Sequence, residues 1–430
     1  MGPVRRPGRR DQDDDRLFPA SSRPCRGLIR PGNDRRRTTL HKRRLADVLF
    51  SLIDLVDRAL SLDARHRPGF RAAPARLQGV MPTPELREEG CLNVPPLVWR
   101  REDLTGALQG PAGVLEEHGV RVSSLPYVSA DADEHARLLR LSGAKLRTLC
   151  ETHWNPGLRP ALRRKLDARM RVTALEGETI LLGAYFADCN NYFHFWIDAM
   201  SDLWFLAQCG VDLSSVRNVL MPWNGVRWQR EIARLCGLPE ERIVPLSSAD
   251  GFVLEKLHLA VRTKGGFRNH DWIVSALREL SGWRAPRSDA PATGASGRRI
   301  YVTRGGALRR PLFNEAAVLE ALAPFGFDVV DCASLTVTDQ RALFASAEIV
   351  VAPHGAGLTN IVWARSGTKL VELMPRGHAN PCFMDLASQA GVAYGVVPSV
   401  VEEDGVNPIY AGFGVDPADV AVLVRRMLDG

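Results

Sequence analysis

Ala345–Trp363, with the sequence Ala-Ser-Ala-Glu-Ile-Val-Val-Ala-Pro-His-Gly-Ala-Gly-Leu-Thr-Asn-Ile-Val-Trp, predicts a buried strand, a glycine-rich turn and a helix. Glu348–Ala352 is the short β-branched run required by a strand covered on both faces, and Pro353 ends it. The next four residues are His354, Gly355, Ala356 and Gly357, and a helix is expected from Leu358. Glycines let backbone N–H groups approach a ligand closely, and a helix start favours anions. The stretch therefore predicts an α/β fold and a phosphate or diphosphate ligand, although such glycines also serve simply to pack a helix on a sheet.

Neighbouring strands carry charged groups at the same edge of the expected sheet. Arg304 ends the apolar run that starts at Arg299, and Asn314 and Glu315 open the helix that follows. Downstream, Glu372 lies near the carboxyl end of another short apolar run. Ligands of open α/β sheets bind at the carboxyl ends of the strands. An arginine, a glycine-rich helix start and a carboxylate at one edge together suit a nucleotide diphosphate.

Strands alternating with helices on both sides of a linker predict a mainly parallel sheet in each half. The linker is residues 284–297, which are rich in Pro, Gly, Ser and Ala. The expected division is a basic, mostly disordered arm with an amphipathic helix at 1–80, a first Rossmann-like domain at 81–283, the linker at 284–297 and a second Rossmann-like domain at 298–430.

The first half contains a polar group within an aromatic segment, residues 190–204. In a helix, His194 and Asp198 would stand four residues apart on one face, with Asn191 one turn earlier. An imidazole beside a carboxylate suits proton transfer. The alternative is an ordinary i,i+4 pair on a helix whose aromatic residues are core. The spacing of these residues does not match a zinc site, and no Asp-x-Asp pair follows a strand to clamp a divalent metal.

Charge is concentrated at the start of the chain. Of the net charge of +7, residues 1–70 contribute +8, from 17 basic and nine acidic residues, so the remaining 360 residues sum to −1. The folded part therefore has no global basic field, and no nucleic-acid partner is expected. The apolar segment Leu45–Leu62 is interrupted by Asp47, Asp54, Asp57 and Arg58, which predicts an amphipathic helix instead of a membrane span. We expect a cytoplasmic protein, with the arm as a candidate for peripheral contact with the inner face of the membrane.

Four of these motifs, taken in order, resemble glycosyltransferase family 61. They are Asn191-Tyr-Phe-His194 with Asp198, Tyr301-Val-Thr-Arg304 with Asn314-Glu315, Ala352–Asn360, and Val371-Glu-Leu373. The resemblance covers roughly Tyr185 to Pro375 and leaves the first 90 residues without a counterpart. It implies a GT-B fold of two Rossmann-like domains facing a cleft. It also implies an inverting glycosyltransferase, with a role in polysaccharide biosynthesis such as capsule formation.

The resemblance also implies roles for individual residues. Asp198 or His194 would be the base that deprotonates the acceptor hydroxyl, with Asp198 slightly preferred. The donor would be held by Arg304, His354, Gly355, Ala356, Gly357, Asn360 and Glu372. Among these, Arg304 and the glycine-rich turn would hold the diphosphate, Glu372 would bind ribose hydroxyls and His354 would steer the leaving group. Asn191, Asn314 and Glu315 would support the site.

The implied partners are a nucleotide-sugar donor, used as a substrate, and a glycan or lipid-linked glycan acceptor. No separate cofactor and no metal are expected, because Arg304 and the helix start would offset the charge of the leaving diphosphate. Two alternatives remain: a transferase of a non-sugar group, pyruvyl or phosphoryl, to a glycan, and a nonenzymatic scaffold of the same fold.

Overall fold

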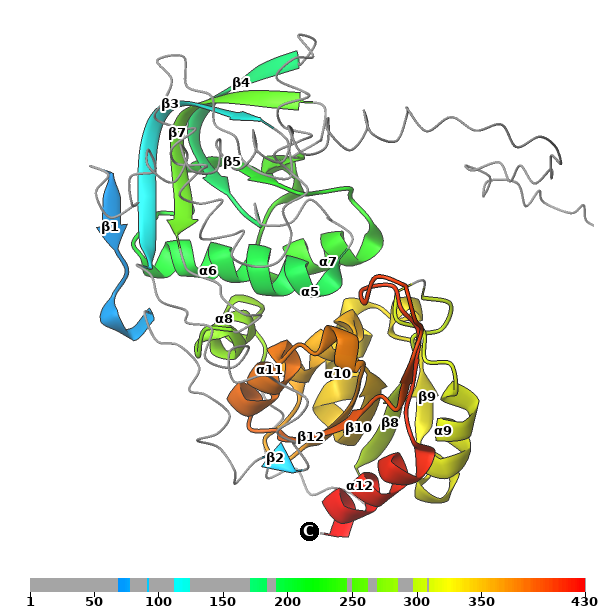
Figure 1. Cartoon of the computed structure of the whole chain (residues 1–430). Coiled ribbons are helices and arrows are strands. Elements are labelled where there is room, and N and C mark those ends of the chain that lie inside the picture. Colours follow the sequence, from blue (N-terminus) through cyan, green and yellow to red (C-terminus); the bar gives the residue numbers. More distant parts are fainter. Residues whose placement is uncertain are drawn as a thin grey trace, which may run out of the picture. The chain divides into compact units, whose positions relative to one another are not determined.

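The structure is a computed structural model that describes residues 69–77, 91–92, 112–123, 171–183, 191–245, 250–261, 269–284, 297–307 and 309–429. It contains two six-stranded sheets connected and covered by helices (Figure 1). The predicted α/β class is confirmed. The expected N-terminal arm, apart from residues 69–77, and most of the linker lie outside the described residues.

The second sheet is parallel throughout and has the strand order β2-β12-β11-β10-β8-β9. Its strands are β2 (Cys91–Leu92), β8 (Arg298–Val302), β9 (Asp328–Val330), β10 (Ala347–Pro353), β11 (Lys369–Met374) and β12 (Ala393–Pro398). The first strand of the βα series, β8, and the third, β10, are neighbours, so their connections leave in opposite directions. This switch point, with the residues that follow β8 and β10, is where open α/β sheets bind ligands.

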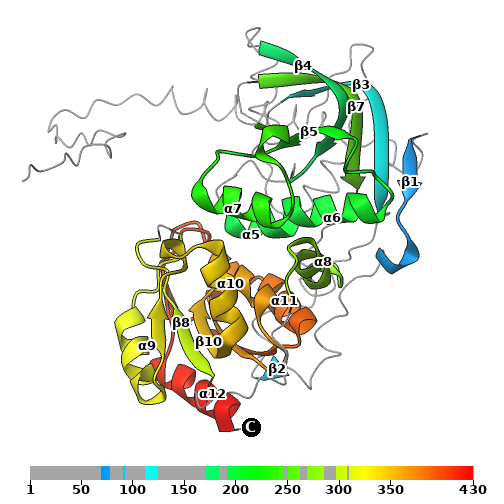
Figure 2. The same ribbon diagram turned by 180° about the vertical axis from the view of Figure 1, so that it is seen from behind.

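Helices cover the second sheet on both faces, as its strands require. Figures 1 and 2 show α9 (Glu315–Leu322) and α12 (Pro417–Asp429) on one side, and α10 (Val337–Ser346) and α11 (Cys382–Ala390) on the other. Side chains alternate between the faces: Ile349 and Val351 pack with α9 and α12, whereas Val350 and Ala352 pack in the opposite core. Shorter elements complete this half: η7 (Ala323–Phe325), η8 (Cys332–Ser334), η9 (Ala356–Trp363), η10 (Arg376–His378) and the hairpin of β13 (Val401–Glu402) and β14 (Phe413–Gly414).

The first sheet is mixed, with the order β1-β3-β7-β4-β5-β6. Its strands are β1 (Phe70–Ala72), β3 (Gly113–Ser123), β4 (Arg171–Leu181), β5 (Val216–Met221), β6 (Ile243–Pro245) and β7 (Asp250–Val261). The four strands from β7 to β6 are parallel, and β3 and β1 add antiparallel pairs. The helical elements of this half are η2 (Ala75–Leu77), α5 (Tyr192–His194), η5 (Phe195–Met200), α6 (Ser201–Gln208), α7 (Arg227–Leu235), η6 (Glu240–Arg242) and α8 (Ile273–Leu280).

Two strands differ from the expected domain boundaries. β1 lies inside the range expected to be a disordered arm, yet it pairs with β3, and its Phe70 ring packs where a Cβ at residue 113 would be only 2.5 Å away, so Gly113 is needed there. β2 lies inside the range expected for the first domain, yet it pairs with β12 of the second sheet. Both strands are only two or three residues long, and such short runs give no usable periodicity in sequence.

One hydrophobic core contains residues of both sheets. Phe195, Trp196 and Leu277 of the first half belong to the same buried cluster as Ile361 and Trp363 of the second. The indole rings of Trp196 and Trp363 meet edge to face with centroids 5.2 Å apart. The helices that carry the candidate site residues of both halves are therefore packed on each other.

Candidate functional site

His194 and Asp198 form a hydrogen-bonded pair in the helical segment that follows β4. The Nδ1 atom of His194 lies 2.7 Å from Oδ2 of Asp198. The His194 side chain is 20% exposed, whereas that of Asp198 is 4% exposed. Of the two, the imidazole is the group that a solvent-borne substrate can reach. With Nδ1–H donating to the carboxylate, Nε2 is the basic nitrogen of the ring.

The backbone around this pair is not a regular α-helix. The single turn α5 begins at Asn191, whose Oδ1 accepts hydrogen bonds from the N–H groups of Phe193 and His194. The chain then forms a π-helical segment, η5, before α6 continues the helix. Such wide turns occur frequently at functional sites. Asn191, predicted as a supporting residue, thus fixes the start of the segment that presents His194.

The glycine-rich turn after β10 packs directly against Arg304. The Arg304 guanidinium donates from Nη1 to the carbonyl of His354, at 2.5 Å, and from Nη2 to the carbonyl of Arg309, at 2.7 Å. A Cβ at position 355 would lie 1.8 Å from Nη1 of Arg304, so only glycine allows this contact. Gly355 therefore has a packing role. The following residues Ala356 and Gly357 open η9, and Gly355 is its N-cap residue.

His354 and Glu372 meet because β10 and β11 are parallel neighbours. Ala352 pairs with Glu372 in register, so the residue that follows Pro353 lies beside the carboxylate. Nδ1 of His354 is 2.6 Å from Oε1 of Glu372, and the hydroxyl of Tyr394 donates to Oε2 at 2.6 Å. Burial lowers the pKa of His354 and raises the pKa of Glu372 to about 8. Burial is the largest cause of both shifts, because the dry surroundings penalise charge, and the nearby Arg310 and Arg304 lower the pKa of His354 further. The pair therefore stays neutral overall and keeps a proton between its members.

Three arginines, Arg304, Arg309 and Arg310, lie in the loop between β8 and α9, which we call the arginine loop. Burial, followed by the neighbouring arginines, lowers the pKa of both Arg304 and Arg310 to about 10. The Nε atoms of Arg304 and Arg310 are buried and have no hydrogen-bond partner among the described residues. Within that part of the chain, neither arginine forms an ion pair with a carboxylate. Uncompensated cations with unsatisfied donors are suited to an anionic ligand.

Asn314, Glu315 and Asn360 make contacts inside the protein. Asn314 bonds both backbone groups of Val415, and Glu315 accepts from the hydroxyls of Tyr301 and Thr303 at the end of β8. Asn360 is fully buried; its Nδ2 donates to Oε1 of Gln340 at 2.7 Å, and its Oδ1 accepts from the Tyr192 hydroxyl at 3.0 Å. These three residues hold elements together around the site.

Aromatic rings bring the two groups of candidate residues to one region. Phe193, the neighbour of His194, meets Phe383 edge to face with ring centroids 5.5 Å apart. Phe383 in turn lies 5.1 Å from the ring of His354, centroid to centroid. The His194–Asp198 pair and the His354–Glu372 pair are therefore connected through two phenylalanine rings, those of Phe193 and Phe383.

Sequence reasoning missed several members of this region. Tyr394 and Phe383 have no motif around them, and only the fold shows that they contact Glu372 and His354. Arg310 had a signal, because it follows Arg304 and Arg309 in a short loop after a strand. That loop therefore carries two half-buried arginines instead of one.

No helix in the part of the chain that the structure describes combines the length and apolar character needed to cross a membrane. Among the same residues, no cluster of three or more His, Cys, Asp or Glu side chains is arranged to hold a metal ion.

Part of the chain matches a known protein family. No curated protein matches the chain. The model of the family described as Glycosyltransferase 61 matches residues 192–371, a segment that runs from the start of α5 into β11 and includes His194, Asp198, Arg304 and the turn after β10. The resemblance to glycosyltransferase family 61 seen in the motifs is thereby confirmed for this segment of the chain.

Proposed function

We propose that the protein is an inverting glycosyltransferase of the GT-B type that moves a sugar from a nucleoside diphosphate to a hydroxyl group of a glycan or lipid-linked glycan, in polysaccharide biosynthesis. One observation carries the proposal. The contacts from Phe193 to Phe383 to His354 join a His–Asp pair suited to deprotonation with an arginine loop suited to a diphosphate. A transferase needs both groups at one site. A scaffold would not need them together.

In the proposed reaction, His194 is the base and Asp198 orients it. The acceptor oxygen attacks C1 of the donor sugar while Nε2 of His194 takes the hydroxyl proton. The bond from C1 to the phosphate oxygen breaks, and its electrons leave with the nucleoside diphosphate. The buried carboxylate of Asp198 stabilises the imidazolium through the Nδ1–H bond at 2.7 Å. The greater exposure of His194 favours it over Asp198 as the base, the reverse of the preference from sequence.

The leaving diphosphate is stabilised by the arginine loop and the start of η9. Negative charge builds on the phosphates as the glycosidic bond breaks, and donors already fixed in a dry site stabilise it most. Arg304 is fixed by two carbonyls and Arg310 is half buried beside it. Gly355 lies next to Arg304, and the amides of Ala356 and Gly357 follow it at the start of η9. The reaction proceeds without a metal under this proposal, so we expect activity to persist in a chelator.

Glu372 acts in this scheme through His354. Both of its oxygens are already engaged, Oε1 with Nδ1 of His354 and Oε2 with the hydroxyl of Tyr394, and its side chain is fully buried. These contacts favour a positioning role over direct binding of ribose hydroxyls. His354, held in one orientation, presents Nε2 toward the phosphates of the leaving group.

The test is a screen of purified protein with nucleoside diphosphate sugars, with and without chelator, followed by NMR of the product anomer. We expect hydrolysis or transfer from one sugar nucleotide, product of inverted configuration, and loss of nucleotide binding in Arg304→Ala. Retained configuration would contradict the inverting mechanism. Binding of a different donor without any sugar-nucleotide turnover would favour the pyruvyl or phosphoryl transferase. Binding of a ligand without turnover of any kind would favour the nonenzymatic scaffold. Location in the cytoplasm stays a prediction.

A further inference from the structure

A hairpin at the carboxyl edge of the second sheet lies beside the arginine loop. It consists of β13, β14 and the residues 403–412 between them, and it lies outside the segment that matches the family model. In Figures 1 and 2 this orange-red hairpin rises beside the carboxyl ends of β8 and β9. Nothing in the proposed mechanism uses it.

The hairpin is fixed to the arginine loop. The amide of Phe413 donates to the carbonyl of Pro311 at 2.9 Å, and the amide of Phe313 donates to the carbonyl of Phe413 at 2.8 Å. Nη1 of Arg310 donates to the carbonyl of Ile409 at 3.3 Å. The Phe313 ring covers the backbone at Gly412, where a Cβ would lie 2.2 Å from ring atoms. The hairpin and the loop therefore form one part with a fixed geometry.

Tyr410 presents an exposed ring next to the cations of that loop. Tyr410 is 46% exposed, and the guanidinium of Arg309 lies 5.8 Å from the centroid of its ring. Arg309 is joined to Arg304 through its carbonyl. The order along the surface is thus an aromatic ring, a surface arginine and then the two half-buried arginines.

The backbone of the loop is also unusual. Arg310 has φ of 51°, the left-handed region, and among the described residues it is the one non-glycine residue with positive φ. A long side chain in this conformation is costly, and such costs concentrate at ligand sites. In this conformation the Arg310 guanidinium donates to the carbonyl of Ile409, the residue before Tyr410.

We propose that Tyr410 is the platform on which the nucleobase of the donor stacks, while Arg304 and Arg310 hold its diphosphate. This inference rests on the proposed function and adds to it a subsite for the base. One ribose separates a base from its phosphates, as Arg309 separates Tyr410 from Arg304. Aromatic stacking is tolerant of base identity, so Tyr410 supplies affinity for any nucleotide, and the hydrogen-bonding groups around it decide which one is preferred.

A membrane surface is the competing occupant, because Val401 and Val406 on the same hairpin are 56% and 37% exposed. The charges argue against it. The connecting residues Glu403 and Asp404 are exposed and acidic, and Glu402 precedes them. Anionic lipid would be repelled by this hairpin tip. A nucleotide, in contrast, meets the acids with neutral ribose and base and the arginines with its phosphates.

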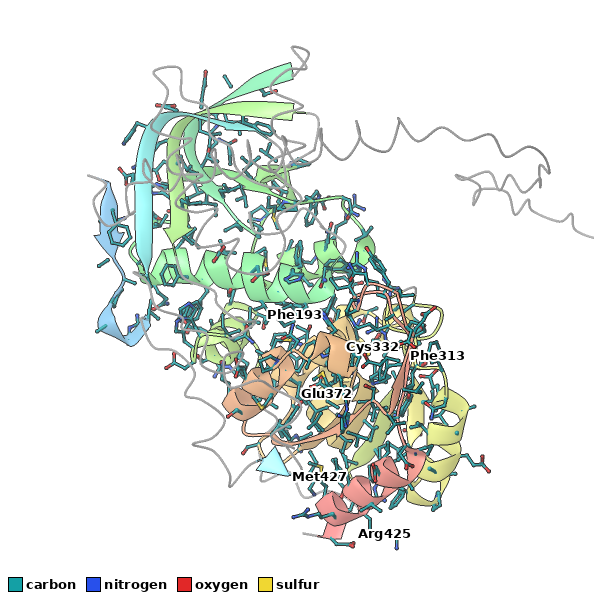
Figure 3. The ribbon with its side chains drawn as sticks, in the orientation of Figure 1. Phe193, Phe313, Cys332, Glu372, Arg425 and Met427 are labelled. Atoms are coloured by element: carbon teal, nitrogen blue, oxygen red, sulfur yellow. The ribbon has the colours of Figure 1, made fainter. Side chains whose placement is uncertain are left out.

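The test measures binding of UDP, ADP, GDP, CDP and inorganic pyrophosphate by calorimetry to five proteins: wild type, Tyr410→Ala, Tyr410→Phe, Arg304→Ala and Phe325→Ala. Phe325→Ala is the matched control, since Arg425 lies over the Phe325 ring at the same 5.8 Å. The control pair lies away from the hairpin. In Figure 3, Arg425 of the control pair is far from Phe313, which packs on the hairpin at Gly412. We expect Tyr410→Ala to weaken the best nucleoside diphosphate about tenfold or more while pyrophosphate changes less than about twofold. Tyr410→Phe and Phe325→Ala should match wild type.

Other outcomes distinguish a failure of the Tyr410 platform from a failure of the proposed donor site. If Arg304→Ala loses binding but Tyr410→Ala binds nucleotide as wild type does, the platform is wrong and the donor site stands. If wild type binds pyrophosphate but no nucleoside diphosphate more tightly, both are wrong. A parallel sedimentation with vesicles of phosphatidylglycerol and phosphatidylethanolamine tests the membrane: if Tyr410→Ala releases the protein from vesicles and leaves nucleotide affinity unchanged, the hairpin is a membrane contact and the platform is overturned.

Discussion

His194 and Asp198 offer a proton acceptor in two different environments. The carboxylate is buried and already accepts from Nδ1 of the imidazole, so an acceptor hydroxyl cannot reach it without displacing His194. The imidazole has the exposed edge. A base must come within hydrogen-bonding distance of the proton that it removes, and geometry therefore ranks His194 first.

Replacing His194 by alanine should lower kcat by about 10²–10⁴-fold, because general base catalysis contributes about that much. Nucleoside diphosphate affinity should stay within about twofold, since the residue does not hold the leaving group. Added imidazole should restore part of the activity of His194→Ala by entering the space left at the surface, but should not restore Asp198→Ala, which keeps its own imidazole. Turnover of His194→Ala within about tenfold of wild type would assign the base elsewhere.

The His354–Glu372 pair makes a prediction for stability against pH. In the unfolded state, the Glu372 carboxyl loses its proton above its ordinary pKa of 4.5, and the His354 imidazole loses its proton above its ordinary pKa of 6.5. Folded, the pair keeps one proton until the raised pKa of Glu372, about 8. Between pH 6.5 and 8 the folded state therefore binds more protons than the unfolded state, and stability contributed by this pair falls as pH rises. The limit is about 1.4 kcal/mol per pH unit.

Glu372→Gln should flatten this part of the curve, because the amide does not titrate. Urea unfolding of wild type and Glu372→Gln at pH 6, 7 and 8 measures it; equal slopes in the two proteins would show that Glu372 carries no extra proton. Tyr394→Phe is the companion variant. It removes one donor to Glu372 that lowers the pKa, so its slope should extend to higher pH.

Sequence located the candidate residues better than it assigned their contacts. The placement of His354, Glu372 and Arg304 at one sheet edge followed from short β-branched runs, each ending in a polar residue, in parallel strands. Their bonds did not follow. Glu372 contacts Tyr394 through the register of β11 with β12, and Arg304 contacts a carbonyl 50 residues away, so both depend on how strands pair after folding.

Among the elements, the turn between β10 and η9 depends on the missing side chain of Gly355. The extended backbone there suits any residue, so the requirement is steric: a Cβ would collide with Nη1 of Arg304. Arg304 cannot yield easily, because its other nitrogen is held by the carbonyl of Arg309. The turn and the arginine loop therefore fix each other.

Gly355→Ala should displace Arg304, weaken nucleoside diphosphate binding by about tenfold or more, and destabilise the protein by about 1–3 kcal/mol, the usual cost of overpacking. Gly306→Ala is the matched control, since it lies in the same arginine loop, and a Cβ there meets nothing within 4 Å. Calorimetry and urea unfolding of the two variants test this. If both variants bind and unfold alike, the contact with Arg304 has no part in shaping the site.

The helical segment of the first half shows where periodicity stops being informative. If residues 190–204 are helical, the sequence predicts that His194 and Asp198 lie on one face, and the contact between them agrees with this. The π-helical segment η5 was not expected, because six residues are too few to distinguish its wider turn from the α-helical repeat. Its apolar residues all point into the core regardless, since this segment lies between the two sheets' helices and is buried throughout.

At the scale of the whole molecule, the halves are joined by more than a linker. The described residues all belong to one compact unit, and a single buried cluster extends through the helices of both sheets. Polar bonds add to it: Arg227 of α7 donates to the carbonyl of Leu335 at 2.8 Å, and the amide of Val337 donates to Glu231 at 2.7 Å. Relative motion of the sheets would have to break these contacts.

Arg278 of α8 tests how far this coupling reaches. Its guanidinium donates to the carbonyls of Val362 and Ala364, both at 2.7 Å, at the end of η9, and lies 4.4 Å from the Trp283 ring centroid. Arg278→Ala leaves two buried carbonyls without their donor, at a cost of roughly 2–4 kcal/mol. Because the core is shared, amides of both sheets should lose hydrogen-exchange protection equally, with one unfolding transition. Arg298→Ala, which removes only an exposed ion pair with Asp328, should leave protection unchanged. Loss of protection confined to the second sheet in Arg278→Ala would mean that the two halves unfold independently.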